Sequence, residues 1–91
     1  MATHIREIVE FNAIDEKGRV LGIVVTRWEE PGKFWVYMQA ARSGKTFGAC
    51  QPCQVFTSLE ERESAIRERV ARTRKSAEKR FPPGAASVIL S

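Results

Sequence analysis

Hydrophobic residues in the first half of the chain follow strand patterns that are separated by turn sequences. Residues 19–28 are apolar at both odd and even positions, as in a strand at the centre of a sheet or covered on both faces. Residues 34–41 and residues 46–56 predict two further strands. A proline-glycine turn at residues 30–33 and a serine-glycine turn at residues 42–45 join the three strands. The pattern therefore predicts consecutive antiparallel strands.

The first segment, residues 1–14, fits two structures. Ile5, Ile8, Val9 and Phe11 suit one face of a helix. Ile5, Val9 and Phe11, with Glu7 between them, also suit a half-buried strand. Its β-branched residues and the turn sequence at residues 15–18 favour the strand.

Pro52 lies inside the last predicted strand. Proline has no N–H to donate to a neighbouring strand, so this strand should lie at a sheet edge or contain a bulge. A simple meander would also place its last strand at the edge, and the two inferences agree.

A long helix is predicted to begin after Thr57 and to end before Pro82. Thr57 and Glu60 have the spacing of a capping box, in which each side chain binds a free backbone N–H at the helix start. A narrow apolar stripe recurs along the helix at intervals of three, four and seven residues. It consists of Leu59, Ile66, Val70, Thr73, Ala77 and Phe81.

Together these elements predict a single α+β domain over residues 1–84. Its architecture is a three- to four-stranded antiparallel meander followed by one long C-terminal helix packed on one sheet face. Residues 85–91 form a tail that is either frayed or a short added strand.

The composition limits the class of protein. The chain has 91 residues, enough for one domain, and its 43% hydrophobic and 29% charged residues exclude a disordered or membrane-embedded chain. No apolar stretch approaches the ~18 residues of a membrane span, and the chain does not start with a secretory signal. Two cysteines give no disulfide framework. We therefore expect a cytoplasmic protein without a membrane partner.

Cys50 and Cys53 form the motif that most resembles a reactive site. A redox pair needs its first cysteine at a helix start, and a zinc site needs four ligands, whereas this chain adds only His4 to its two thiols. We expect two partly buried cysteines beside a bulge; the alternative is a dimer that shares one zinc. The chain has a single histidine to act as the general base that would activate a serine or cysteine nucleophile, which argues against nucleophilic catalysis. The predictions are no enzyme, no cofactor, no metal and no small-molecule substrate.

The strand at residues 34–41 has two distinct faces. Val36 and Met38 suit a core covered by the helix, which leaves Trp35 and Tyr37 for the open face. Around the adjacent turns lie the cations Arg27, Lys33, Arg42 and Lys45. Aromatic rings interleaved with cations can stack on bases and neutralise phosphates. Alternatively, the two rings pack beneath another segment of the chain or against a second subunit.

The second half of the helix is strongly basic, in a chain of net charge +4. Residues 67–80 contain two glutamates and seven cations, namely Arg67, Arg69, Arg72, Arg74, Lys75, Lys79 and Arg80. This number exceeds what the helix dipole needs at its C-terminus, because the dipole acts only over about one turn. The excess indicates an anionic partner, with Arg67, Arg74 and Lys75 as candidate contacts.

The order of residues 32–36, 42–48 and 56–61 resembles the three-stranded-sheet DNA-binding domains of plant APETALA-type regulators and of integrase arm-binding domains. The resemblance covers about the middle half of the chain: a glycine-lysine-aromatic strand, a basic turn, a strand with glycine, and phenylalanine-threonine before an acidic helix start. It implies that the sheet enters the major groove. The implied DNA contacts are Arg27, Trp35, Tyr37, Arg42 and Lys45. A fainter resemblance links the chain to WGR-type modules, which are also tied to nucleic acid.

These observations predict a small basic nucleic-acid-binding module with DNA as its partner, which uses the exposed sheet face, the hairpin turns and the basic helix. The alternative is a protein-interaction or homodimerisation module with no nucleic-acid role.

Overall fold

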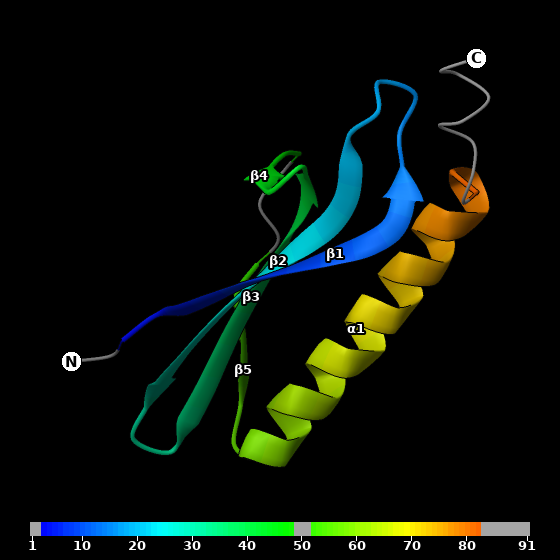
Figure 1. The fold of residues 1–91 in the computed structure, drawn as a ribbon. Coiled ribbons are helices and arrows are strands. Elements are labelled where there is room, and N and C mark those ends of the chain that lie inside the picture. The colour runs from blue at the N-terminus through cyan, green and yellow to red at the C-terminus, as the bar shows by residue number, and fades with distance from the viewer. Residues whose placement is uncertain (1–2, 49–51, 83–91) are drawn as a thin grey trace.

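The structure, a computed structural model, describes residues 3–48 and 52–82. These residues form one antiparallel sheet and one helix (Figure 1). The elements are β1 (Ile5–Ile14), β2 (Val20–Glu30), β3 (Lys33–Arg42), β4 (Lys45–Thr46), β5 (Gln54–Phe56) and α1 (Leu59–Arg80).

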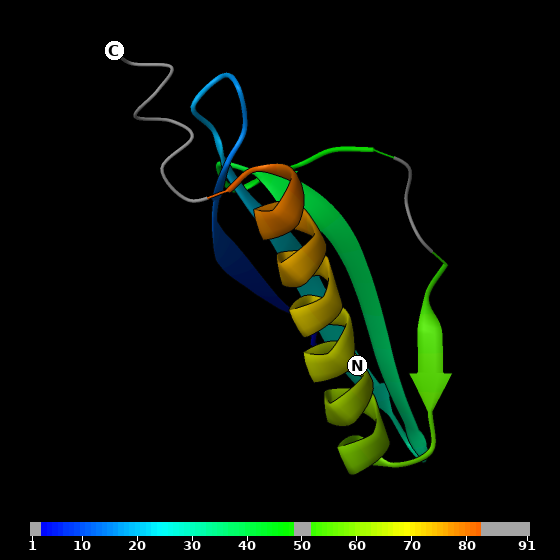
Figure 2. The ribbon, with the colours of Figure 1, turned by 90° about the vertical axis from the view of Figure 1, so that its right-hand side faces the viewer.

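The sheet is a meander in which β2 lies between β1 and β3, and both β4 and β5 pair with the outer edge of β3. The long helix α1 lies across one face of this sheet and contacts β1, β2, β3 and β5 (Figure 2). The predicted α+β meander with a C-terminal helix on one face is therefore confirmed. The predicted tail, residues 85–91, lies outside the described residues.

The first segment is a strand, as its β-branched residues predicted. Its register with β2 is regular from Ile5 to Glu10 and then shifts before Ile14, which marks a bulge. Gly22 lies opposite Glu10, and a Cβ at Gly22 would overlap the carbonyl oxygen of Val9. Only glycine therefore allows β1 and β2 to approach each other this closely beside the bulge.

Both predicted hairpin turns are present. Glu30 pairs with Lys33 across Pro31 and Gly32, and Gly32 takes the positive φ that the turn requires. In the second turn Ser43 and Gly44 both have positive φ, at 49° and 80°. Positive φ at both central residues is the geometry of a type I′ hairpin, whose twist matches that of the flanking strands.

The prediction of one continuous strand over residues 46–56 is wrong. The described part of this stretch contains two short strands, β4 and β5, and Pro52 lies in neither. Gly48 takes a positive φ of 80°, which turns the chain out of the extended conformation soon after β4. The prediction that this part of the chain lies at the sheet edge is confirmed, because both strands pair only with β3 among the described elements.

The predicted helix cap is displaced by one residue. Ser58, not Thr57, is the N-cap: its backbone is extended and its side chain accepts a hydrogen bond from the N–H of Glu61 at 3.4 Å. Ser58 and Glu61 have the same three-residue spacing as Thr57 and Glu60, so the sequence contains two overlapping capping signals. The helix ends at Arg80, as the following proline predicted.

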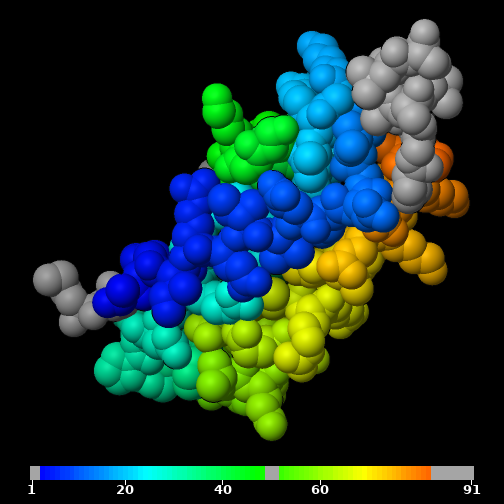
Figure 3. Space-filling view, viewed as in Figure 1, coloured from blue at the N-terminus to red at the C-terminus, as the bar shows by residue number. Residues whose placement is uncertain are grey.

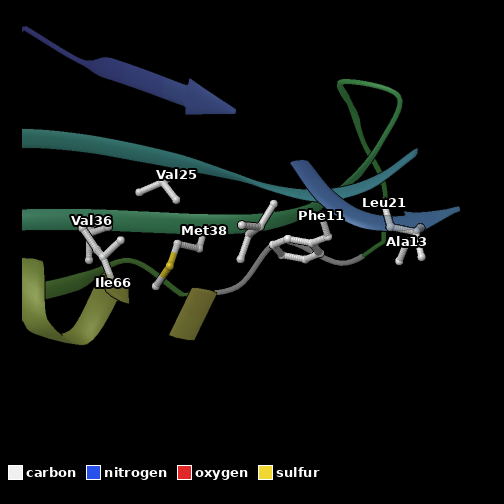
Figure 4. Close-up of a cluster of buried hydrophobic side chains, with 8 residues drawn as sticks. Phe11, Ala13, Leu21, Val25, Val36, Met38 and Ile66 are labelled. Atoms are coloured by element: carbon white, nitrogen blue, oxygen red, sulfur yellow. The ribbon is translucent and has the colours of Figure 1, made fainter. Parts of the chain in front are cut away.

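The core lies between α1 and the helix-facing side of the sheet (Figure 4). Ile66 points from α1 toward Val36 on β3 and is only 4% exposed. The other buried members of this cluster are Phe11, Ala13, Leu21, Ile23, Val25 and Met38. The prediction that Val36 and Met38 face the helix-covered core is confirmed.

One buried residue of α1 is charged. Arg62 is 4% exposed, and its Nε donates to Glu63 Oε2 at 2.9 Å. Its Nη1 lies 3.5 Å from the carbonyl oxygens of both Trp28 and Trp35. Arg62 therefore links the start of the helix to the β2–β3 hairpin.

Candidate functional site

A groove of about 410 Å³ runs between α1 and the part of the sheet formed by Phe11 of β1, the start of β2 and the end of β3, with Phe47 just beyond β4. We call it the arginine groove. Its residues are Phe11, Leu21, Gly22, Ala40, Ala41, Arg42, Phe47, Arg69, Arg72, Thr73, Ser76, Ala77, Arg80 and Phe81. It thus combines an apolar floor with four guanidinium groups, and none of its residues is acidic.

Two of the four arginines have fixed aromatic contacts. The Arg42 guanidinium lies 4.2 Å from the ring centroid of Phe47, and Arg80 lies 5.4 Å from that of Phe81. The Nε of Arg42 is buried, has no hydrogen-bond partner among residues 3–48 and 52–82, and lies 3.7 Å from Asp15 Oδ2. Aromatic stacking holds a guanidinium in place while its N–H groups remain available to an incoming oxygen atom.

Helix geometry brings the other arginines to the same side. Arg69, Arg72 and Arg80, with Ser76 between them, recur at intervals of three and four residues, which places them along one flank of α1. Within the described residues, Arg69 and Arg72 make no ion pair. The guanidinium fork matches phosphate and carboxylate geometry. The arrangement is therefore suited to an anion that also carries an apolar or aromatic portion.

Arg27, a predicted contact residue, is held by two carboxylates. Its Nη1 lies 2.6 Å from Glu7 Oε2 and its Nε donates to Glu63 Oε2 at 3.1 Å. Glu7 comes from β1 and Glu63 from α1, so Arg27 joins three elements. Its side chain is 18% exposed. The structure thus gives Arg27 a structural role on the helix-facing side of the sheet.

The predicted aromatic residues lie on the opposite, open face of the sheet. The indoles of Trp28 and Trp35 stack across β2 and β3 with centroids 5.7 Å apart and an interplanar angle of 1°. The His4 ring lies 4.7 Å from Trp28. Tyr37 donates its hydroxyl to Gln39 Oε1 at 2.8 Å. Both tryptophans and Tyr37 are half-buried, so the rings on this face are neither fully covered nor fully exposed for stacking with a ligand.

The expected convergence of these rings with the predicted cations is not found. Arg27 contacts the helix and Arg42 lines the arginine groove, so both lie on the side away from Trp35. Lys45 is paired with Arg42 and shares its face. Lys33 and Trp35 are two residues apart on β3, so their side chains share a face of the sheet. Lys33 is exposed at the turn, and it is the one predicted sheet cation on the face of the rings.

The predicted helix cations Arg67, Arg74 and Lys75 are all exposed. Arg67 and Arg74 line a second, smaller groove beside β1, which also contains Glu7 and Arg27. Because this groove mixes both signs of charge, it is less suited to an anion than the arginine groove.

Sequence reasoning did not single out Arg69, Arg72, Arg80 and Phe47 as site residues. The spacing of the three arginines was available as a signal, because it places them on one helix flank. That this flank faces Phe47 and the β3–β4 edge depends on the packing of the helix, which local patterns do not encode.

The cysteine motif is only partly within the described residues. Cys53 is exposed, so the expectation that it is partly buried is wrong: it precedes β5 on an uncovered segment. Cys50 lies outside the described residues. Among the residues described, no group of three or more His, Cys, Asp or Glu is placed to hold a metal ion, and no helix is long and apolar enough to span a membrane.

Two carboxyl groups outside the groove have altered acidity. Burial raises the pKa of Glu63, but hydrogen bonds from Arg27 and Arg62 outweigh it and hold the pKa below its ordinary value. Burial likewise raises the pKa of Asp15. Hydrogen bonds from the backbone N–H groups of Arg19 and Lys17 and from the Arg19 guanidinium outweigh burial, so the pKa of Asp15 is below its ordinary value. Asp15 thereby fixes the turn between β1 and β2.

These shifts predict acid destabilisation. A carboxyl group whose pKa is lower in the folded than in the unfolded chain stabilises the fold above the unfolded pKa of about 4, and this contribution is lost as pH falls. We expect the midpoint temperature of thermal unfolding to decrease as the pH is lowered from about 5 to about 3. Glu63→Gln should flatten this dependence, whereas Glu60→Gln, at an exposed position of the same helix, should not. A profile unchanged by Glu63→Gln would contradict the assignment.

The fold and site define a small basic α+β domain. No protein-family model, curated protein or solved structure matches the chain.

Proposed function

We propose that this protein is a non-enzymatic nucleic-acid-binding module with DNA as its partner, and that the arginine groove holds the phosphate backbone. The observation that carries the proposal is the set of four guanidinium groups, Arg42, Arg69, Arg72 and Arg80, around a groove with no acidic residue. Sulfate-sized anions alone would not need the apolar floor. A nucleotide supplies both a phosphate for the arginines and a flat base for the exposed ring of Phe47.

Charge outside the groove supports the same partner. The exposed cations Arg67, Arg74 and Lys75 extend the positive field along α1, which attracts a polyanion before it makes close contacts. The open sheet face has a secondary place in this proposal, because only Lys33 among the predicted sheet cations shares it with the rings.

The test is a fluorescence-anisotropy titration of labelled single-stranded and duplex DNA, with RNA of the same sequence, over a series of salt concentrations. Four phosphate contacts predict a log–log slope of affinity against salt of about −3 to −4. The absence of binding to any of these ligands at low salt would overturn the proposal.

Intrinsic fluorescence identifies the face that binds. The two tryptophans of the chain, Trp28 and Trp35, stack together on the open face. Binding in the arginine groove should leave their emission nearly unchanged, whereas strong quenching on saturation would place the nucleic acid on the sheet face and contradict the groove assignment.

A further inference from the structure

The strand β1 forms one edge of the sheet, and no strand of the described part of the chain pairs with its outer side. Among the described elements β1 pairs only with β2. Figure 3 shows β1 in blue across the front of the molecule, with no other described segment over it. An edge strand presents a row of unpaired N–H and C=O groups, which is a template for another strand.

The side chains of β1 leave apolar surface at this edge. Ile5 is 58% exposed and Ile8 is 48% exposed. Natural edge strands are commonly protected by charged side chains (lysine above all), by proline or by a bulge. The strand β1 contains neither lysine nor proline, and its charged residues Arg6, Glu7 and Glu10 are of both signs, so they can pair with a second strand as well as oppose one. Its bulge lies beyond Glu10, which leaves the segment Ile5–Glu10 regular and free to pair.

We propose that β1 is the contact surface of a homodimer, in which it pairs antiparallel with β1 of a second copy so that Ile8 lies opposite Ile8. In this register Arg6 lies opposite Glu10 of the second copy, and Glu10 lies opposite Arg6 of the second copy. Opposite charges directly across two strands are favourable, and the interaction occurs twice. Arg6 and Glu10 make no ion pair with a described residue of their own chain, so the second copy supplies their partners.

Charge selects this register over its neighbours. Antiparallel pairing about a two-fold axis perpendicular to the sheet puts one residue opposite itself. Centring the axis on Arg6, Glu7 or Glu10 would place like charges opposite each other, which is unfavourable. Centring it on Val9 would place Arg6 opposite Asn12 and so leave Arg6 without an acidic partner. The Ile8 register alone among these combines an apolar centre with two opposite-charge pairs.

The geometry of the dimer follows from the axis. A two-fold axis perpendicular to the sheet keeps each face of the sheet continuous across the contact. Both copies of α1 would therefore lie on the same side. The contact segment Ile5–Glu10 contributes no residue to the arginine groove, because Phe11 is the one residue of β1 that lines it, so pairing of this segment leaves the groove residues free.

The experiment measures the mass of the 91-residue protein by sedimentation velocity over a concentration series. The wild type should convert from monomer to dimer as concentration rises. Arg6→Glu sets two glutamates opposite each other across the contact, and Glu10→Arg sets two arginines opposite each other, so each variant should weaken the dimer roughly tenfold or more. An equimolar mixture of the two variants should regain dimer, because each chain then meets the opposite charge pattern.

Controls separate dimerisation from folding. Circular dichroism should show both variants folded, and Glu16→Arg, at an exposed turn position, should dimerise like the wild type. A wild type that stays monomeric at every concentration would overturn the proposal. So would a dimer that both variants leave unchanged, or a mixture of the two variants that does not reassociate.

Discussion

Replacing Arg69, Arg72 and Arg80 with glutamine is expected to lower the affinity for nucleic acid roughly 100-fold, since each charge-assisted contact contributes about 1 kcal/mol or more. The salt dependence should weaken at the same time, its log–log slope moving toward zero by about 2 to 3. Arg42 is retained because it also contacts Asp15 and Phe47. Glutamine has nearly the helix propensity of arginine, so α1 should persist. Anisotropy titrations at matched ionic strength measure both quantities.

The chain offers a matched control on the same helix. Arg67→Gln, Arg74→Gln and Lys75→Gln remove the same number of charges from positions outside the arginine groove. This variant should lose only several-fold in affinity, because it weakens the long-range field but no close contact. Equal losses in the two triple variants would show that net charge alone governs binding and would contradict the groove as the contact site.

The strands and turns of this protein are predictable because their signals are local. Pro31 and Gly32 satisfy a two-residue turn by their own backbone preferences. In the next hairpin Gly44 does the same, and Ser43 takes a positive φ beside it. The central position of β2 also followed from its continuous apolar run. The division of residues 46–56 into two strands was not predictable in this way, because pairing with β3 decides where each short strand begins and ends.

The separation of rings and cations was partly within reach of the sequence. Side chains alternate along a strand, so the neighbours Arg27 and Trp28 must point to opposite faces. The same rule separates Arg42 from Trp35 and Tyr37 on β3. What the sequence does not contain is the partner of each cation: Glu63, which binds Arg27, is 36 residues away in the chain.

Arg62 shows a similar limit. Its position between Leu59 and Ile66 is typical of a solvated arginine beside an apolar stripe. In the structure it is buried, because carbonyl oxygens of the β2–β3 hairpin, 27 and 34 residues away, together with Glu63 satisfy its N–H groups. A buried guanidinium is tolerated only with such partners, and they are set by tertiary packing.

Ile66→Ala is expected to destabilise the protein by about 2 to 4 kcal/mol, because it removes buried methyl groups and leaves a cavity between α1 and Val36. A domain of this length has a free energy of unfolding of about 5 to 14 kcal/mol, so the loss is a large fraction of the total. Leu59 belongs to the same predicted stripe but is 48% exposed. Leu59→Ala should therefore cost less than about 1 kcal/mol. Urea unfolding followed by circular dichroism measures both, and equal costs would contradict the placement of Ile66 in the core.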